Sequence, residues 1–352
     1  MIENKRVMEC VPNFSEGRRP EVIEAIAAAI GSVEGSRVLH VDPGFDANRT
    51  VITFAGDPDA VVEAAFRAVK CASQLVDMRR HTGRHPRIGA TDVLPLVPVR
   101  GITLEECAEY ARRLSKRIYE ELGIPVYCYE AAAYKEKWRN LAVCRAGEYE
   151  ALAARIVQPE EMPDYGGGEY TLQAARSGAS VVGARKFLIA VNFNLNKEAS
   201  VDCAKEIALD VHEKGRIVKR DGVPVLDENG NVVRRPGTLK ACKAIGWYIE
   251  EYGRAQVSMN VTDIDVAPLH KVFEEVSRVA LLRGARVTGT EIIGLVPERV
   301  LVEAGRYFAS QRGCSCVDDS EAVSIAVETM GLSEIAPFVP KDRIIERLLF
   351  DR

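Results

Sequence analysis

The sequence contains no long hydrophobic run, and this absence excludes one class of protein at the outset. No apolar stretch approaches the ~18 residues that a membrane-spanning helix needs, and the polar segment from Met1 to Cys10 lacks the apolar core of a secretory signal. Charge of one sign is also missing, because 47 Lys and Arg residues face 51 Asp and Glu residues. We therefore expect neither a membrane nor a nucleic-acid partner.

Two families of sequence motif are absent as well. The nine cysteines are odd in number and form no C-x-x-C pair, which argues against a disulfide framework or a zinc ribbon and favours a cytoplasmic protein. No G-x-G-x-x-G follows a strand and opens a helix, so the sequence does not predict a dinucleotide site.

Periodicity in both halves of the 352 residues predicts the order strand-helix-strand-strand-helix-strand. This is the split βαβ order, and we predict an α+β protein of two ferredoxin-like subdomains. The Gly-rich stretch 166–178 suggests the boundary, giving domains 1–180 and 181–352. An insertion near 216–237 carries the turn signal Asn229-Gly230 between basic flanks, and it is either a solvated hairpin or a flap over an anionic ligand.

Local signals place several elements. Asp57-Pro58 begins a helix that should reach about Met78. Thr103 and Glu106 form a capping box for a helix ending near Gly123. Because Pro95 and Pro98 lack backbone donors, the strand 93–99 is predicted to lie at a sheet edge. The tryptophan segment 245–248 is interpreted as core.

The densest polar cluster is the segment 78–90, which holds His81, His85 and four arginines. A metal site is one interpretation, because His81 and His85 have the i, i+4 spacing of zincins, but Gly83 and Pro86 oppose the helix this would need. A structural loop with satisfied imidazoles is the second. The third is an acid/base site, since imidazole is the natural base near pH 7 and arginine binds carboxylates. The residues alone leave the last two open.

Several ordered segments resemble the glutamate formimidoyltransferase (formiminotransferase) family. They span nearly the whole chain and are Glu9–Gly17, Val41–Gly44, Asn48–Val51, His81–Ala90, Pro98–Gly101, Gly183–Phe187, Ala244–Tyr248 and Gly294–Pro297. Each is weak alone, but together they make the resemblance specific.

The resemblance implies transfer of the formimino group of N-formimino-L-glutamate to N5 of tetrahydrofolate, a step of histidine degradation. It implies tetrahydrofolate as co-substrate, no metal, a ligand cleft between the subdomains and a homodimer. The family's catalytic histidine matches His85, and its folate loop matches 166–178, including Gly166, Gly167, Gly168 and Gly178. No cyclodeaminase domain is expected in this sequence.

Other site residues are weighed against this background. Asp42 either steadies the positive formimino group or orients His85, or it merely forms a turn in Val41–Gly44. Cations are predicted to hold the substrate carboxylates, and the candidates are Arg49, Arg79, Arg87, Arg100, Arg185 and Lys186. The glycines 166–168 either let backbone approach a ligand or form a linker.

Other functions stay open. A formyl donor, N-formylglutamate, differs from the formimino donor by one heteroatom. A folate-binding protein without turnover is a different class, but it would have no use for a positioned base at His85. A hydrolase with a metal on His81 and His85 is the last alternative.

Overall fold

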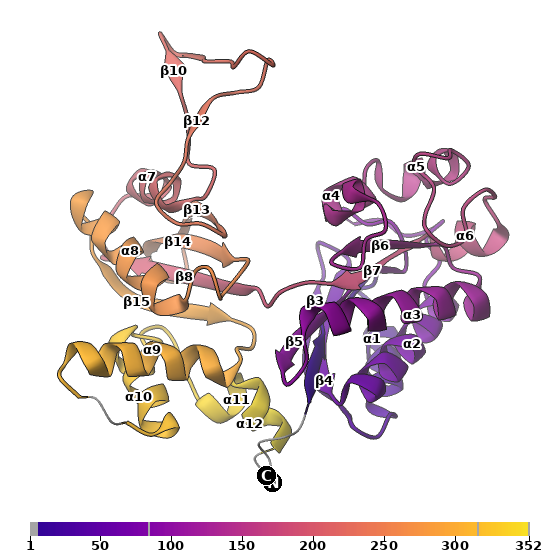
Figure 1. Cartoon of the computed structure of the whole chain (residues 1–352), viewed down its shortest axis with the longest axis horizontal. Coiled ribbons are helices and arrows are strands. Elements are labelled where there is room, and N and C mark those ends of the chain that lie inside the picture. Colours follow the sequence, from indigo (N-terminus) through magenta and orange to yellow (C-terminus); the bar gives the residue numbers. More distant parts are fainter. Residues whose placement is uncertain (1–5, 84, 315–316, 351–352) are drawn as a thin grey trace. The chain divides into compact units, whose positions relative to one another are not determined.

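The computed structural model describes residues 6–83, 85–314 and 317–350. The chain divides into two units, Met1–Lys186 and Phe187–Arg352 (Figure 1). The division lies a few residues after the predicted boundary, because the strand Ser180–Ala184 pairs with strands of the first unit. None of the described helices is long and apolar enough to cross a membrane.

The first unit contains a seven-stranded sheet with helices on both faces. Its strands are β1 (Val7–Cys10), β2 (Asn13–Phe14), β3 (Ser36–Gly44), β4 (Arg49–Gly56), β5 (Thr91–Arg100), β6 (Val126–Glu130) and β7 (Ser180–Ala184). Its helices are α1 (Pro20–Gly31), α2 (Pro58–Leu75), α3 (Leu104–Leu122), the 3₁₀ turn η1 (Glu136–Arg139), α4 (Leu141–Cys144), α5 (Glu148–Arg155) and α6 (Leu172–Ser177).

Strands β1 and β2 both pair with β4 on one side and β5 on the other, so the spatial order is β3, β4, β1/β2, β5, β7, β6. The pairs β5–β7 and β7–β6 are parallel, and the remaining neighbours are antiparallel. Alternate residues of β5 face two cores: Leu94 packs with α1, α2 and α3, whereas Val93 packs with Trp138 of η1. The sheet is therefore covered on both faces where β5, β7 and β6 lie.

The predicted helix starts in this unit are confirmed. Asp57 accepts a hydrogen bond from the Asp59 N–H at 3.0 Å and caps α2, which ends at Leu75. Thr103 and Glu106 form the capping box of α3, and Gly123 ends that helix with φ 67°. The signals are local, so tertiary contacts did not override them.

The prediction that 93–99 is an edge strand is wrong. Strand β5 pairs with β1 on one side and with β7 on the other. Pro95 costs little here because its carbonyl still accepts a hydrogen bond from the Val11 N–H at 3.3 Å. Proline lacks only the backbone N–H, so a central strand tolerates it at a position where that N–H would not donate to a neighbouring strand.

The second unit has a four-stranded antiparallel sheet in the order β13, β14, β8, β15. Its elements are β8 (Ile189–Leu195), α7 (Val201–Val211), β9 (Arg216–Ile217), β10 (Lys219–Arg220), β11 (Val223–Pro224), β12 (Arg234–Arg235), β13 (Cys242–Ile249), β14 (Arg254–Val261), α8 (Leu269–Leu282), β15 (Val287–Ile293), α9 (Glu298–Gln311), α10 (Asp319–Thr329), α11 (Pro340–Arg343) and α12 (Ile345–Phe350). The element order β8-α7-β13-β14-α8-β15 repeats β1-α1-β3-β4-α2-β5 of the first unit. Both have the same spatial order of strands.

The insertion forms an arm that projects from the second unit (Figure 1). Its stem is the pair β9–β12, and β10–β11 and the turn at Asn229-Gly230 follow beyond it. Gly230 has φ 79°, which is the conformation the predicted turn requires. Arg216 anchors the stem by ion pairs with Glu206 and Asp210 of α7.

The interpretation of segment 245–248 as core is wrong. Ile245 is 60% exposed, Trp247 39% and Tyr248 44%. Strand β13 is the edge of its sheet, so its side chains have cross-strand neighbours on one side only. The Trp247 Nε1–H donates to Gln256 at 3.0 Å, and Gln256 donates to Asn194 at 2.6 Å, so a polar network crosses this face.

Candidate functional site

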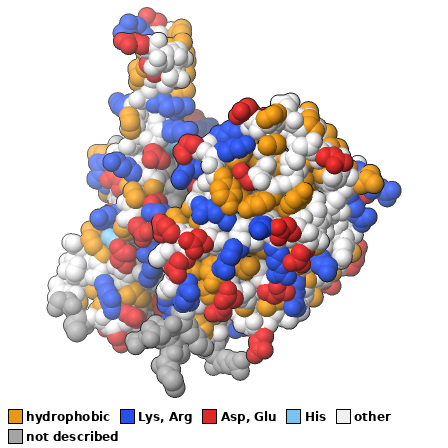
Figure 2. Space-filling view, turned by 45° about the vertical axis from the view of Figure 1, so that its right-hand side comes forward, with side chains coloured by type: hydrophobic (Ala, Val, Ile, Leu, Met, Phe, Trp, Pro, Cys, Tyr) orange, Lys and Arg blue, Asp and Glu red, His pale blue; other side chains and the backbone are white. Residues whose placement is uncertain are grey.

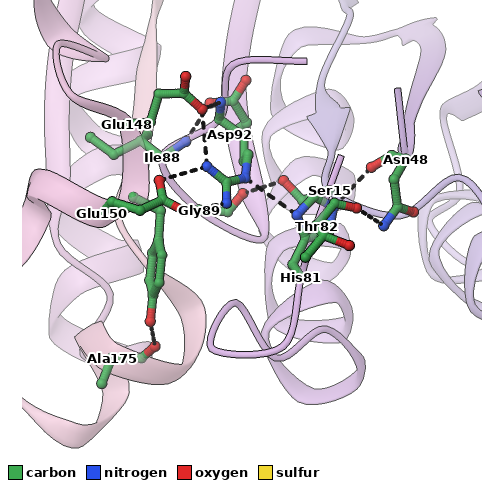
Figure 3. A network of polar contacts seen from close by, with 12 residues as sticks. Ser15, Asn48, His81, Thr82, Ile88, Gly89, Asp92, Glu148, Glu150 and Ala175 are labelled. Atoms are coloured by element: carbon green, nitrogen blue, oxygen red, sulfur yellow. Dashed lines mark hydrogen bonds and ion pairs between the residues drawn. The ribbon is translucent and has the colours of Figure 1, made fainter. Parts of the chain in front are cut away.

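The predicted acid/base loop joins α2 to β5, and Figure 3 shows the polar network around it. The described residues 81–83 and 85–90 contain no helix, so the spacing of His81 and His85 does not place both rings on one helical face. No group of three or more His, Cys, Asp or Glu side chains among the residues with described positions could hold a metal ion. Arg84 of the motif lies outside the described residues.

His85 is half-buried, and its Nδ1 lies 2.7 Å from the carbonyl oxygen of Pro86. A carbonyl oxygen can only accept, so Nδ1 carries the proton and Nε2 holds the lone pair. Burial lowers the pKa of His85, and the positive charges of Arg49 and Arg145 lower this pKa further against the opposing effect of the Pro86 carbonyl. The ring is therefore neutral near pH 7, as a base must be before it acts.

Arg49 projects from β4 on the sheet face opposite α1, α2 and α3. Burial lowers the pKa of its guanidinium, while the charges of Asp92 and Asp42 act in the opposite direction. Its buried Nε has no hydrogen-bond partner among the described residues. An unsatisfied buried donor is costly, so this nitrogen is suited to a ligand oxygen.

Asp92 and Arg145 are site residues that the sequence analysis missed. The Asp92 carboxylate is 1% exposed and binds Arg145, with Nε to Oδ1 at 3.1 Å and a second contact from Nη2. It also accepts the Ile88 N–H at 3.0 Å, which ties the end of the His85 loop to the ion pair. An acidic residue inside an otherwise apolar strand was the signal that could have revealed Asp92.

Arg87 was predicted to hold a substrate carboxylate, and within the protein its guanidinium pairs with two carboxylates. It is buried, and its guanidinium binds Glu148 at 2.9 Å and Glu150 at 2.6 Å (Figure 3). Its Nε donates to His81 Nδ1 at 3.3 Å. Each of its side-chain nitrogens is thus engaged, and these contacts fasten the His85 loop to α5.

His81 is a structural member of this network. Its Nε2 lies 2.9 Å from the carbonyl oxygen of Asn48, so Nε2 donates and Nδ1 accepts from Arg87. Asn48 in turn donates to the Thr82 carbonyl at 2.8 Å and accepts the Gly17 N–H at 3.0 Å. Both ring nitrogens of His81 are occupied by protein, which leaves no lone pair for a metal.

Asp42 does not lie in the predicted turn. It belongs to β3, opposite Val51 in the register, and the turn follows at residues 45–48. The side chain is exposed, and its charge acts on Arg49, two registers along the same sheet face. Asp42 therefore influences His85 through the charge of Arg49, and Asp42 and His85 do not contact each other.

The predicted folate-loop glycines separate into two places. Gly178 has φ 68°, and a Cβ there would lie 2.2 Å from the Ile88 carbonyl, so the His85 loop packs directly against it. Gly166 has φ 76° and packs on Tyr119 and Pro125, and Gly167 packs on Met162. A Cβ at Gly168, with φ 101°, would meet open space.

Arg185 follows β7 at the end of the first unit. Its Nη1 donates to the Lys186 carbonyl at 3.1 Å, and its backbone N–H donates to the Leu96 carbonyl at 3.1 Å. Its charge acts on buried Tyr129 and Cys10. Of the predicted residues, the structure therefore places Arg49 where its charge acts on His85, with Asp42 beside Arg49 and Gly178 behind the loop.

Known proteins resemble this chain over nearly its full length. A family model described as the formiminotransferase domain, N-terminal subdomain, matches residues 7–185, and one described as the formiminotransferase domain matches residues 190–350. The formimidoyltransferase-cyclodeaminase of Sus scrofa is 44% identical, a match covering 98% of this chain and 60% of that protein.

Shorter relatives match over most of both chains. The glutamate formimidoyltransferase of Streptococcus pyogenes serotype M1 is 37% identical over 86% of this chain and 93% of its own length. That of Thermoplasma acidophilum is 37% identical over 87% of this chain and 93% of its own. The chain spans about three fifths of the bifunctional relatives. It belongs to the formiminotransferase family.

Proposed function

We propose that this protein is a glutamate formimidoyltransferase, which transfers the formimino group of N-formimino-L-glutamate to N5 of tetrahydrofolate. Family membership supports the substrates, and the neutral His85, with its Nδ1–H held by Pro86, supports the chemistry. Tetrahydrofolate is a co-substrate in this proposal, and no step needs a metal.

The proposed reaction needs one group that takes and returns a proton. N5 of tetrahydrofolate attacks the formimino carbon, and Nε2 of His85 accepts the proton that N5 loses. The bond from that carbon to the glutamate nitrogen then breaks, and His85 returns the proton to this nitrogen. The products are 5-formiminotetrahydrofolate and L-glutamate, so atoms and charges balance.

The charges around His85 favour these proton-transfer steps. Arg49 and Arg145 favour the neutral ring before attack. When His85 becomes protonated, Glu148 is the nearby carboxylate that stabilises the positive ring. We assign Asp42 the role of holding Arg49, and Asp92 with Arg145 the role of positioning the loop. These are proposals for positioning residues, since none of them contacts His85 directly.

Finer features of the architecture belong to the same proposal. The repeated element order and strand order support two ferredoxin-like subdomains, which we assign to residues 1–186 and 187–352. We propose that the substrates bind in a cleft that both subdomains line, with Gly178 and Arg185 on the first side. Trp247, half-exposed on the edge strand β13 of the second sheet, offers a surface on which a pterin ring could stack. The active form is proposed to be a homodimer.

The decisive experiment is His85→Ala in the full chain. Formation of 5-formiminotetrahydrofolate should slow by ~10²–10⁴-fold while tetrahydrofolate still binds, because general acid/base catalysis contributes about that much. His212→Ala, in the second unit, is the matched control and should leave the rate unchanged. A normal rate for His85→Ala would remove His85 from the mechanism.

A second assay separates the remaining alternatives. N-formimino- and N-formyl-L-glutamate are offered in parallel to the wild-type protein with tetrahydrofolate. Turnover of the formimino donor alone is expected. Preferential turnover of the formyl donor would replace the proposed donor, and folate binding without any product would indicate a binding protein.

A further inference from the structure

A depression of about 600 Å³ lies in the first unit beside His81. His81 lines it, whereas His85 does not. Five arginines from three separate segments contribute to its wall: Arg18, Arg19, Arg79, Arg80 and Arg176. We call it the arginine pocket. Charges of both signs are interspersed over the face of the molecule that Figure 2 shows.

The pocket carries a surplus of positive charge. Among the described residues that line it, only Glu16 and Asp77 are acidic. Arg19 pairs with Glu16 at 2.5 Å, and Arg79 pairs with Asp77 at 2.6 Å. Five arginines and two carboxylates give these lining residues a net charge of +3. His81 adds no charge, because its Nδ1 accepts a hydrogen bond from Arg87 and therefore carries no proton.

Three arginines keep donors for a ligand. Arg18 uses Nε on the Phe45 carbonyl, and Arg176 uses Nη2 on the Gln74 carbonyl, so each retains other N–H groups. The Arg80 side chain makes no hydrogen bond or ion pair within the described part of the chain. Guanidinium forks of this kind bind carboxylates bidentately.

The walls of the pocket are held in place by backbone contacts. Glu16 accepts the N–H groups of Arg18 at 2.9 Å and Arg19 at 3.0 Å, which fixes the turn before α1. Burial raises the pKa of Glu16, but these hydrogen bonds and Arg19 outweigh it and lower the pKa overall. On the other wall, the Met78 N–H donates to the Arg176 carbonyl at 2.8 Å.

We propose that the arginine pocket binds the two carboxylates of a glutamate moiety. The inference rests on the proposed function, in which the donor and the folate each carry one glutamate and free glutamate is released. A dicarboxylate matches the surplus charge and can engage Arg18 on one wall and Arg80 on the other. The Arg87–His81 contact then joins the occupied pocket to the His85 loop.

The variant R18Q/R80Q tests this in the full chain. Titration with L-glutamate should show binding that weakens about ten- to a hundredfold in the variant, as expected for lost hydrogen bonds to charged groups. K70Q/K116Q, on exposed faces of α2 and α3, removes the same charge and should bind like wild type. R18K/R80K should recover part of the affinity. Melting temperatures verify that all variants fold.

Steady-state kinetics of the R18Q/R80Q variant show which substrate supplies the glutamate moiety. A raised KM for N-formimino-L-glutamate with kcat within about twofold places the donor in the pocket, whereas a raised KM for tetrahydrofolate places the folate tail there. The proposal is overturned if both KM values and glutamate binding are unchanged. It is also overturned if inorganic phosphate binds as well as L-glutamate. Because the titration needs no turnover, an inactive wild type would refute the proposed function and leave this test intact.

Discussion

The two units share one arrangement of strands and differ in where loops are enlarged. In the first unit the connection from α2 to β5, residues 76–90, is long and carries His85. The equivalent connection in the second unit, from α8 to β15, has only residues 283–286. Conversely, the connection from α1 to β3 in the first unit has residues 32–35, whereas the equivalent connection from α7 to β13 in the second unit has residues 212–241 and includes the arm.

The repeated β-α-β-β-α-β scaffold therefore does not by itself specify where chemical groups are placed. The same β-α-β-β-α-β frame presents a charged, tightly bonded loop in one unit and a projecting arm in the other. Loops on a rigid frame are where binding and catalytic groups are usually placed. The four predictions below test whether the two enlarged loops are as different energetically as they are structurally.

The largest effect is expected for Asp92→Ala, which leaves Arg145 buried without its partner and frees the Ile88 N–H. The free energy of unfolding should fall by about 3–5 kcal/mol. Asp319→Ala in the second unit breaks an exposed pair with Arg306 and should cost about 0.2–1 kcal/mol. Urea titrations measure both. Equal losses would mean that the ion pair does not anchor the loop.

Gly178→Ala should destabilise by about 1–3 kcal/mol, because φ is positive and the new Cβ meets the Ile88 carbonyl. Gly284, in the short connection of the second unit, has φ 73° and open space around it. Gly284→Ala therefore isolates the backbone strain, and the excess loss at Gly178 measures the packing of the His85 loop. Equal losses of stability for the two variants in thermal unfolding would show that the His85 loop can shift to accommodate the new Cβ.

Arg49→Met should shift the pH dependence of the site. Removing a positive neighbour raises the pKa of His85 from its lowered value, so the neutral ring is lost at a higher pH as the solution is acidified. The acidic limb of kcat/KM should move upward. NMR titration of the His85 ring follows this without substrate, with His212 in the second unit as internal reference. A downward shift would contradict the assigned electrostatics.

The smallest effect is expected at the arm. Replacing residues 218–233 by an Asn-Gly turn retains the stem and the Arg216 ion pairs. Stability should change by less than about 0.5 kcal/mol, and both KM values should hold, because the removed residues are largely exposed. A rise in KM for either substrate would instead identify the arm as the flap over an anionic ligand that its basic flanks suggested.

Local sequence signals predicted local structure well. The caps at Asp57 and Thr103, the Asn229-Gly230 turn and the strand and helix order need only neighbouring residues, so the sequence alone specifies them. Where a neighbour in space decides, prediction was weaker. Strand β5 became internal because β7 arrives from much later in the chain. Segment 245–248 stayed exposed because β13 is an edge strand, whose side chains have neighbours on one side only.

The α+β class, the repeated element order and the candidate loop around His85 can be predicted from the amino-acid order, because periodicity, caps and motifs are encoded in short segments. Which charges surround that histidine depends on how the chain folds. Burial and the charges of Arg49 and Arg145, which come from other elements, lower the pKa of His85, and Glu148 from α5 occupies Arg87. Electrostatic interactions depend on distance in space, and distance along the chain does not reveal it.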